Sequence, residues 1–309
     1  MLLSSLLLTA LPLAANTINV VQSNDDGWAM INIRELHRSL TDAGFSSIIS
    51  APADNKSGKG SKDAEPVQVG HKGCQFGSCP SFSPPYGNNA SEPQFNYVNS
   101  YPVTAMRHGI QNLSQTFFAG PPDIALSGPN AGNNLRWAAR RSGTVGAAVE
   151  AAELGVPAIA FSGPGHYRPW TDPVQPYMEI YSELSTIVVE VLTNGSKPYL
   201  PDDTILNVNY PHLQDVCESV SDVNFVLTRV FPRWVFRFLD LSPRRDDVEM
   251  CGSKLLPDEQ SVVRGKGCHA SISVMSTKKK DVDAEKQRFV ADRLGSILTC
   301  LPGKRRKGL

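Results

Sequence analysis

Two adjacent carboxylates follow a β-branched, apolar run in the stretch Ile18-Asn19-Val20-Val21-Gln22-Ser23-Asn24-Asp25-Asp26-Gly27. The run predicts a first strand, and the two acids come where that strand ends. In an open α/β sheet, ligands bind beyond the carboxyl ends of the strands, where loops supply polar groups on a rigid support. Asp25 and Asp26 therefore indicate a metal-dependent site. The alternative is an ordinary Asp-Asp-Gly turn with solvated acids.

The pattern of an apolar strand followed by a polar loop repeats in the next segment. A helix that Gly44 can close is predicted first, with one apolar face made of Ile31, Ile33, Leu36, Leu40 and Ala43. Residues 47–51 form a second predicted strand, and the loop after it is Pro52-Ala53-Asp54-Asn55-Lys56-Ser57-Gly58-Lys59-Gly60. Its glycines permit close approach to an anion, its lysines carry positive charge, and Ser57 offers a hydroxyl to a metal or phosphate. An ordinary flexible loop is the alternative.

Residues 123–127 form a third predicted strand, which runs into Gly128-Pro129-Asn130-Ala131-Gly132-Asn133-Asn134. Oxygen-bearing side chains again follow a strand end. The next segment, Arg141-Ser142-Gly143-Thr144-Val145-Gly146-Ala147-Ala148-Val149-Glu150, begins like an N-capped helix and is rich in small residues. Ser142 and Thr144 with the free amides of the helix start suggest a phosphate cradle. Ordinary capping is the alternative, and the same residues could do both.

These segments together resemble the SurE family of metal-dependent phosphatases and nucleotidases, which includes secreted fungal acid phosphatases. Order and spacing both fit, and the resemblance extends through Leu154-Gly155-Val156-Pro157-Ala158-Ile159-Ala160 and the Asn-rich stretch Leu206-Asn207-Val208-Asn209-Tyr210-Pro211. Tyr210 is an extra residue relative to the family's Asn-x-Pro pattern. The resemblance covers roughly residues 18–298 and implies a Rossmann-like three-layer α/β sandwich with a C-terminal oligomerisation extension.

The resemblance also implies the site residues. It places the metal ligands at Asp25, Asp26, Ser57 and Asn130 and the phosphate-binding groups at Asn134, Ser142, Gly143 and Thr144. All four ligands offer oxygen, which suits a hard divalent cation such as Mg²⁺ or Mn²⁺. Asp25 and Asp26 are the catalytic candidates, and the sequence does not decide which of them is ligand only and which orients water or attacks phosphorus.

Other chemistries have little support in the sequence. It contains no His-Glu-x-x-His, no Gly-x-Ser-x-Gly elbow and no phosphate-binding Gly-x-x-x-x-Gly-Lys-Ser/Thr loop, and no Gly-x-Gly-x-x-Gly follows the first strand. The 30 basic and 30 acidic side chains give zero net charge, so there is no electrostatic case for a nucleic acid polymer or a membrane surface as partner. The family resemblance implies a small phosphomonoester as the partner, with a nucleoside monophosphate first among the candidates.

Several features predict export of the chain. Residues 1–15 are rich in Leu and Ala, carry no charge and are too short to span a bilayer, so they fit a signal peptide better than a membrane anchor. The alternative is a truncated start or a buried first strand. Six cysteines form an even set that allows three disulfides, and Cys74 and Cys79 are the nearest pair. Four glycosylation sequons begin at Asn55, Asn89, Asn112 and Asn194.

We therefore expect a signal peptide at 1–15, a phosphatase domain at 16–300 with an insertion at about 60–99, and a basic tail at 301–309. The insertion is rich in Gly, Pro, Ser and Asn, which favours turns and a lid or rim over the site. Four aromatic residues in or just after the insertion either stack on a nucleobase or hold down the loop: Tyr86, Phe95, Tyr97 and Tyr101. Residues 173–194 and 282–298 are predicted as amphipathic helices.

The predicted function is that of a secreted, metal-dependent phosphomonoesterase, either an acid phosphatase or a nucleotidase, that forms a homodimer or a larger assembly. The assembly follows from the resemblance alone. The alternative from another class is a secreted binding protein of the same fold that holds metal or nucleotide without turnover, and a serine esterase is a more distant one.

Overall fold

The structure, a computed structural model, describes residues 17–213, 217–233 and 246–302. The predicted signal peptide and residues 303–309 of the predicted tail lie outside the described residues. Along the described chain the strands are β1 (Asn19–Ser23), β2 (Ser46–Pro52), β3 (Tyr86–Asn89), β4 (Glu92–Val98), β5 (Ile124–Ala131), β6 (Ala158–Gly163), β7 (Thr204–Asn209), β8 (Asn224–Thr228) and β9 (His269–Ser276). The longer helices are α1 (Ile31–Asp42), α2 (Pro102–His108), α5 (Gly143–Glu153), α6 (Pro176–Thr193) and α9 (Ala284–Leu294).

Shorter helical segments connect these elements. They are η1 (Gln75–Gly77), η2 (Gly109–Leu113), α3 (Ser114–Phe118), α4 (Trp137–Arg141), η3 (Val220–Asp222) and α8 (Glu259–Val263). None of the helices in the described residues is both long and apolar enough to cross a membrane.

The described strands form a single nine-stranded sheet in the order β3-β4-β2-β1-β5-β6-β7-β9-β8. The six strands from β4 to β7 in this order run parallel, while β3 is antiparallel to β4 and β9 is antiparallel to β7. Strand order reverses on either side of β1, which lies between β2 and β5. This is the position at which doubly wound sheets bind their ligands.

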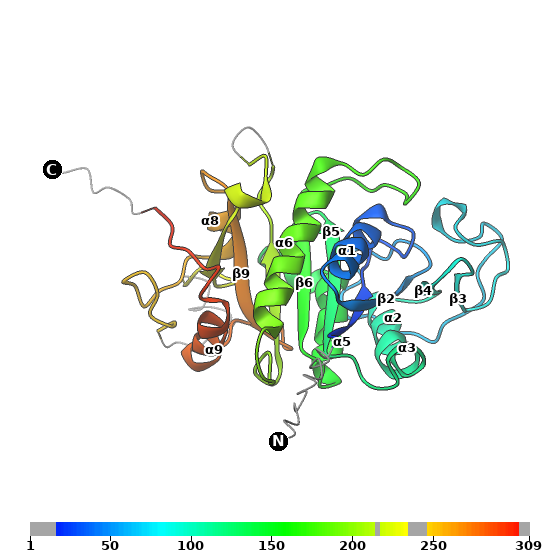
Figure 1. The fold of residues 1–309 in the computed structure, drawn as a ribbon, viewed down its shortest axis with the longest axis horizontal. Coiled ribbons are helices and arrows are strands. Elements are labelled where there is room, and N and C mark those ends of the chain that lie inside the picture. The colour runs from blue at the N-terminus through cyan, green and yellow to red at the C-terminus, as the bar shows by residue number, and fades with distance from the viewer. Residues whose placement is uncertain (1–16, 214–216, 234–245, 303–309) are drawn as a thin grey trace, which may run out of the picture.

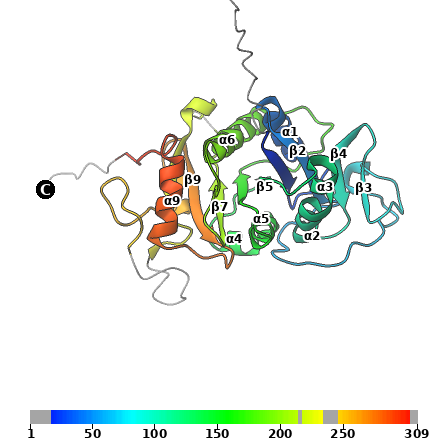
Figure 2. The same cartoon turned by 60° about the horizontal axis from the view of Figure 1, so that its bottom comes forward.

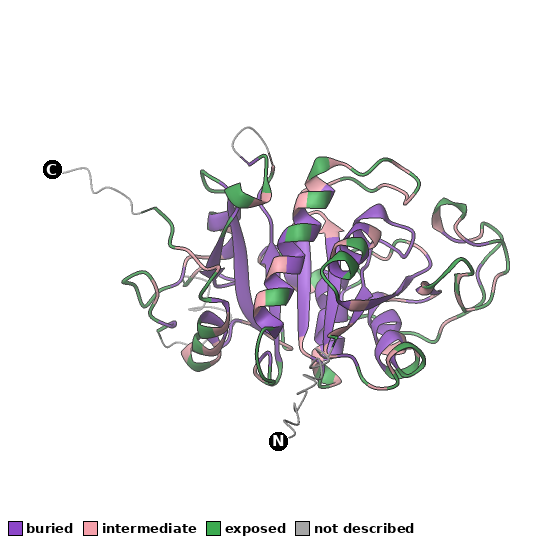
Figure 3. Cartoon of the chain, in the orientation of Figure 1, coloured by how far each residue is buried: buried purple, intermediate pink, exposed green. Residues whose placement is uncertain are grey.

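Helices cover both faces of this sheet, which confirms the predicted Rossmann-like three-layer α/β sandwich. Figure 2 shows α1 and α6 above the sheet and α2, α4 and α5 below it. Successive residues of β1 alternate between the two cores, because Val20 faces α1 and α6 while Val21 faces α2 and α5. In Figure 3 the strands are buried along most of their length and the outer helix faces are exposed.

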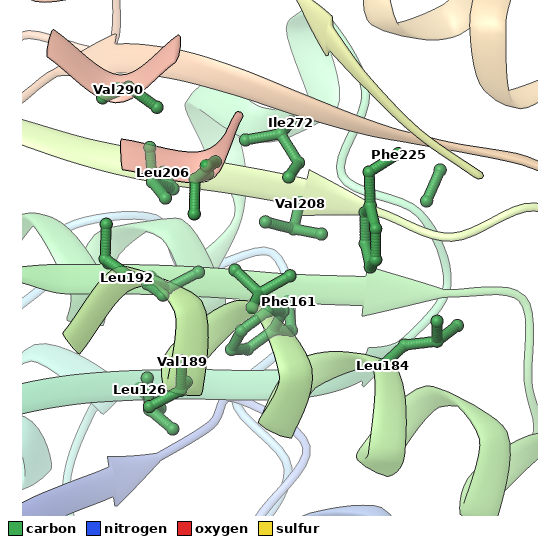
Figure 4. Packing of buried hydrophobic residues seen from close by; sticks show 14 of the residues in the cluster. Leu126, Phe161, Leu184, Val189, Leu192, Leu206, Val208, Phe225, Ile272 and Val290 are labelled. Atoms are coloured by element: carbon green, nitrogen blue, oxygen red, sulfur yellow. The ribbon is translucent and has the colours of Figure 1, made fainter. Parts of the chain in front are cut away.

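The two cores differ in the size of their side chains. On the α6 side, Phe161, Leu206 and Val208 of the strands pack against Leu184, Val189 and Leu192 of the helix (Figure 4). On the α5 side, the strands and the helix contribute mainly alanine and valine, including Ala125, Ala158, Ala160, Ala147, Ala148 and Ala151. Small residues on both partners let α5 lie close to the sheet, and this brings its first turn to the strand ends.

The second half of the predicted insertion belongs to the sheet. Strand β4 pairs in parallel with β2, and the hairpin of β3 and β4 forms one edge of the sheet. Phe95 and Tyr97 on β4 are buried in a core with Trp28, Met30 and Ile49, so the hypothesis that these two rings stack on a substrate is wrong. Tyr86 packs instead against His108, with 4.5 Å between ring centroids. Tyr101 lies 5.9 Å from the Lys56 ammonium, a position that leaves its proposed stacking untested.

The six cysteines form three disulfides, Cys74–Cys79, Cys217–Cys268 and Cys251–Cys300. The nearest pair predicted from the sequence is therefore correct. The other two bridges connect residues 51 and 49 positions apart in the C-terminal part of the chain.

We expect the loop lengths to set the stabilities of these bridges. The entropy of closing a loop gives about 4 kcal/mol for one of roughly 50 residues and about 2 kcal/mol for one of roughly 5. The double substitution Cys217→Ala/Cys268→Ala should therefore lower the free energy of unfolding more than Cys74→Ala/Cys79→Ala, as measured by denaturant titration of both variants. Equal losses in the two variants would contradict this ranking.

Candidate functional site at the carboxyl ends of the parallel strands

The predicted carboxylate pair lies in a tight turn directly after β1. Asn24 closes this turn, because its Nδ2 donates to the Gly27 carbonyl at 2.9 Å and its Oδ1 accepts from the Gly27 N–H at 3.0 Å. Asp25 and Asp26 are only 2 % and 4 % exposed. The alternative of a surface turn with solvated acids is therefore wrong.

Asp25 is held by the first turn of α5. The Gly143 N–H donates to its Oδ2 at 3.1 Å and the Thr144 hydroxyl donates to its Oδ1 at 2.6 Å. A side chain at position 143 would place its Cβ 2.7 Å from the Asp25 Cβ, so only glycine fits. The amides at a helix start carry partial positive charge, and here that charge faces a carboxylate.

This arrangement differs from the predicted phosphate cradle. Gly143 and Thr144 donate to Asp25, and the Ser142 Oγ accepts from the Val145 N–H at 3.1 Å as the N-cap of α5. The capping alternative is what Ser142 does in this structure. A direct contact of Ser142, Gly143 or Thr144 with phosphate remains a prediction.

Asp26 is held by two other loops. The Ser57 hydroxyl donates to its Oδ1 at 3.1 Å, and the Ala131 N–H donates to its Oδ2 at 2.9 Å. The Ser57 loop is itself fixed to the acidic turn, because the Lys56 N–H donates to the Asp25 carbonyl at 2.7 Å. Asn130 directly precedes Ala131, and its Nδ2 donates to the Gly132 carbonyl at 2.6 Å. The structure thus brings Ser57 to Asp26 and places the backbone of Asn130 beside it.

Asn134, the remaining predicted phosphate-binding residue, is buried and firmly held. Its Nδ2 donates to the Ser162 Oγ at 2.7 Å, and its backbone N–H donates to the Asn209 Oδ1 at 2.8 Å. Its carbonyl accepts from the Nδ2 atoms of Asn207 and Asn209 at 3.0 and 3.3 Å. The period-two spacing of these two asparagines on β7 was visible in the sequence, although no site role followed from it.

The electrostatics of the pair favour a bound cation. Burial raises the pKa of Asp25, against the lowering effect of Thr144 and Gly143. Burial and the neighbouring Asp25 charge raise the pKa of Asp26 to about 7. Within residues 17–213, 217–233 and 246–302, neither carboxylate forms an ion pair with a lysine or arginine. Two adjacent buried carboxylates without a counter-charge are costly, and a divalent cation would remove that cost.

The donor set fits a hard cation. Asp25, Asp26, Ser57 and Asn130 all offer oxygen atoms, as Mg²⁺ and Mn²⁺ prefer. No group of three or more His, Cys, Asp or Glu side chains stands together in the described part of the chain, so a site rich in imidazole or thiolate is absent there. The chemistry of the donors therefore agrees with the predicted cation.

Two cavities lie at opposite ends of the parallel strands. One of about 380 Å³ is lined by Gly132 and Asn133, next to Asn130, and by His166 from the loop between β6 and α6. A larger one of about 860 Å³ is lined by Pro157 and Thr204, at the opposite ends of β6 and β7 from the site. The smaller cavity thus borders the loop after β5, on the same edge of the sheet as the carboxylate pair, although neither carboxylate lines it.

Fold and site together define an α/β protein with a cluster of buried oxygen-bearing side chains at the carboxyl ends of its parallel strands. Residues 20–233 match the family described as Survival protein SurE, and the chain belongs to this family. It is 31 % identical over 289 residues to an acid phosphatase of Yarrowia lipolytica, which covers 86 % of this chain and 80 % of the relative. It is 29 % identical over 196 residues to the 5'-nucleotidase SurE of Lawsonia intracellularis, covering 63 % of this chain and 67 % of the relative.

The fold has a counterpart of known structure. The SurE protein from Aquifex aeolicus superimposes with a TM-score of 0.58 over 84 % of this chain and 93 % of its own, at 23 % sequence identity. At this identity the likeness concerns the fold alone.

A buried acid that the sequence analysis did not identify is connected to Asn134 through hydrogen bonds. Glu259 at the start of α8 is fully buried, and its Oε2 accepts from the Asn207 Nδ2 and the Ser273 hydroxyl, both at 2.9 Å. Its Oε1 accepts from the Arg136 N–H at 2.5 Å. Because Asn207 also donates to the Asn134 carbonyl, Glu259 is joined to the site through one residue.

Glu259 should make the stability of the protein depend on pH. Burial raises its pKa from 4.5 to about 8, so the folded state holds a proton that the unfolded state releases across this range. The free energy of unfolding should therefore decrease as pH rises from about 4.5 through about 8. Glu259→Gln keeps the shape and removes the titration. Its melting temperature relative to wild type should increase between pH 5 and pH 8, as measured by scanning calorimetry. Parallel pH dependences of the two proteins would contradict the assignment.

Proposed function

We propose that the chain is a secreted, divalent-metal-dependent phosphomonoesterase that acts at the Asp25–Asp26 turn. Membership of the SurE family, with an acid phosphatase and 5'-nucleotidases among its relatives, makes it a hydrolase of phosphate monoesters. The observation that carries the metal dependence is the pair of adjacent, buried carboxylates whose partners are hydroxyl and amide groups. A phosphomonoester carries about two negative charges near neutral pH, and such a pair would repel it without a cation.

Each side chain has a distinct task in this proposal. Asp25, Asp26, Ser57 and Asn130 would hold a divalent cation, which would neutralise charge and lower the pKa of a water molecule. Gly143 and Thr144 fix the orientation of the Asp25 carboxylate, and Ala131 fixes that of Asp26. The Asn134 Nδ2 carries two hydrogens and gives one to Ser162, so the second is the donor that we propose for a phosphate oxygen.

The proposed substrates are small phosphomonoesters, with nucleoside monophosphates first among them. The names of the relatives support both a broad acid phosphatase and a 5'-nucleotidase. The zero net charge of the chain gives no support to a nucleic acid polymer as substrate. The competing function is a binding protein of the same fold without turnover. The convergence of three polar segments on the two carboxylates, together with relatives that are named as enzymes, favours hydrolysis over it.

Substitution of the carboxylates should test this function. Asp25→Asn and Asp26→Asn keep nearly the same shape but remove a charge, so metal affinity and rate should fall together. The loss of one transition-state contact of about 3 to 4 kcal/mol corresponds to a rate decrease of roughly a hundredfold to a thousandfold. The measurement is hydrolysis of p-nitrophenyl phosphate across a Mg²⁺ and Mn²⁺ titration, with Asp42→Asn on the exposed side of α1 as the matched control.

Two outcomes of that titration would argue against the proposal. Normal rates of both site variants after removal of divalent cations by a chelator would place the chemistry elsewhere in the molecule. Tight metal binding by the wild-type protein without hydrolysis of any phosphomonoester would instead support the binding function.

Secretion is proposed from the apolar residues 1–15, the four sequons and the three disulfides. We expect the mature chain to begin near Asn16 and to contain no free thiol. N-terminal sequencing, intact mass and thiol titration of protein collected from the culture medium would check this. A full-length chain with reactive thiols that is retained in the cell would contradict it. Light scattering on the same material should show a homodimer or a larger assembly, which we propose from the family resemblance.

A further inference from the structure

Two exposed aromatic rings from distant segments meet beside the candidate site. Phe76 in the disulfide-closed part of the insertion and Tyr167 in the loop between β6 and α6 have ring centroids 5.2 Å apart and planes inclined by 47°. They are 41 % and 43 % exposed. Figure 1 shows the β6–α6 loop extending towards the side of the molecule where the insertion lies. Large aromatic side chains that remain this exposed while already in contact leave apolar surface available to a ligand.

Tyr167 is connected to the loop that carries a proposed metal ligand. Burial raises the pKa of the Tyr167 phenol, the charges of Asp26 and Asp54 raise it further, and a hydrogen bond with the Asn55 side chain lowers it. The Asn55 Oδ1 in turn accepts from the Ser57 N–H at 2.7 Å. The phenol therefore lies within electrostatic reach of Asp26 and is one residue removed from Ser57.

Phe76 is held on the other side of the same site. Its neighbour Gln75 donates its N–H to the Ala53 carbonyl at 3.2 Å, and the disulfide Cys74–Cys79 closes the short loop around it. The Gln75 amide lies against Gly27 so closely that a Cβ at Gly27 would come 2.1 Å from its Oε1. The insertion thus contacts Gly27, the last residue of the acidic turn, through Gln75.

The backbone of Phe76 indicates a fixed presentation of its ring. Its φ of 56° lies in the left-handed region, which bulky residues rarely adopt. Such conformations persist where surrounding contacts determine them and concentrate at ligand-binding sites. The disulfide and the contact of Gln75 with Gly27 supply that constraint. The ring consequently projects from the loop instead of packing beneath it.

We propose that Phe76 and Tyr167 form an aromatic platform that holds the planar leaving group of an aromatic phosphomonoester, either a nucleobase or an aryl ring. This proposal rests on the proposed function and deepens it by naming the substrate class. With the phosphoryl group at Asp26, the remainder of the substrate extends from the site towards the platform, because Gln75 beside Phe76 lies against Gly27 and Asn55 connects Tyr167 with Ser57. Stacking on aromatic side chains accepts any base, because every base has a π face.

The experiment compares substrates that differ only in their leaving group. The ratio of kcat/KM for adenosine 5'-monophosphate, and for p-nitrophenyl phosphate, to that for glycerol phosphate is measured at saturating divalent cation. Phe76→Ala and Tyr167→Ala should lower both ratios about tenfold, mainly through KM. Phe76→Tyr and Tyr167→Phe should restore them, because each keeps an aromatic ring. Phe82→Ala is the matched control, since Phe82 belongs to the same insertion, also has a positive φ of 59° and is 63 % exposed.

A second readout does not depend on turnover. Adenosine, which lacks the phosphate, should inhibit glycerol phosphate hydrolysis competitively in wild type, and its inhibition constant should rise about tenfold in Phe76→Ala. A drop in ratio for the nucleotide alone would identify a nucleobase as the ligand, and a drop for both substrates would identify aromatic rings in general.

The contrary outcomes separate the two proposals. Unchanged ratios in both alanine variants, or an equal loss for all three substrates, would overturn the platform and leave the phosphatase function intact. Absence of hydrolysis of every phosphomonoester by the wild-type protein would overturn the proposed function, and the platform with it. A fall in ratio for Phe82→Ala equal to that for Phe76→Ala would also overturn the platform, because the effect would then belong to the insertion as a whole.

Discussion

The structure is organised around the need to bury two neighbouring carboxylates at one point. Asp25 and Asp26 follow each other in the chain, so they cannot separate, and each must find its own partners in the interior. Asp25 accepts hydrogen bonds from the start of α5. Asp26 accepts hydrogen bonds from the Ser57 loop and from the backbone after Asn130. Three segments that are far apart in the sequence are thereby brought to the carboxyl end of β1. Every carboxylate oxygen accepts a hydrogen bond, but burial still raises the pKa of both acids, so the hydrogen bonds offset only part of the cost of two charges at this point.

The small side chains between α5 and the sheet serve this same end. A helix packed over leucine or phenylalanine would stand farther from the strands, and its first turn would not reach the end of β1. Alanine on both partners, and glycine at position 143, allow the helix start to come within hydrogen-bond distance of a carboxylate. The larger residues are placed on the opposite face, under α6, where no close approach is required. The division of large and small residues between the two cores is therefore a condition of the site.

Much of this architecture follows from local sequence patterns. The strand ending at Ser23, the helix beginning near Ser142 and the polar loops after β2 and β5 each carry a periodicity or a capping signal, so their positions were predictable. The convergence of Asp25, Asp26 and Ser57 was predictable because parallel strands bring their carboxyl ends to one edge. Features that depend on contacts between distant segments could not be predicted in this way. Phe95 and Tyr97 lie in a segment with proline and glycine nearby, and only the pairing of β4 with β2 decides that their rings are buried.

The same limit applies to the groups that surround the site. Ser142 can cap a helix or bind an anion with the same hydroxyl, and the structure shows the cap. Glu259 looks like any surface acid until β7 and β9 place Asn207 and Ser273 beside it. Phe76 and Tyr167 are 91 residues apart, and nothing local indicates that their rings meet. Contacts of this kind depend on the assembled sheet and are absent from any short window of sequence.

The hydrogen bond between the Gly143 N–H and the Asp25 carboxylate also has a consequence for folding. Its two residues are 118 positions apart, so it forms only after β1 and β5 have paired and α5 has docked. Contacts of such long range form late, because the cost of closing the intervening chain precedes any gain from them. A partly folded chain therefore lacks the geometry for catalysis. The orientation of the Asp25 carboxylate is therefore a property of the assembled sheet and not of any single segment of the chain.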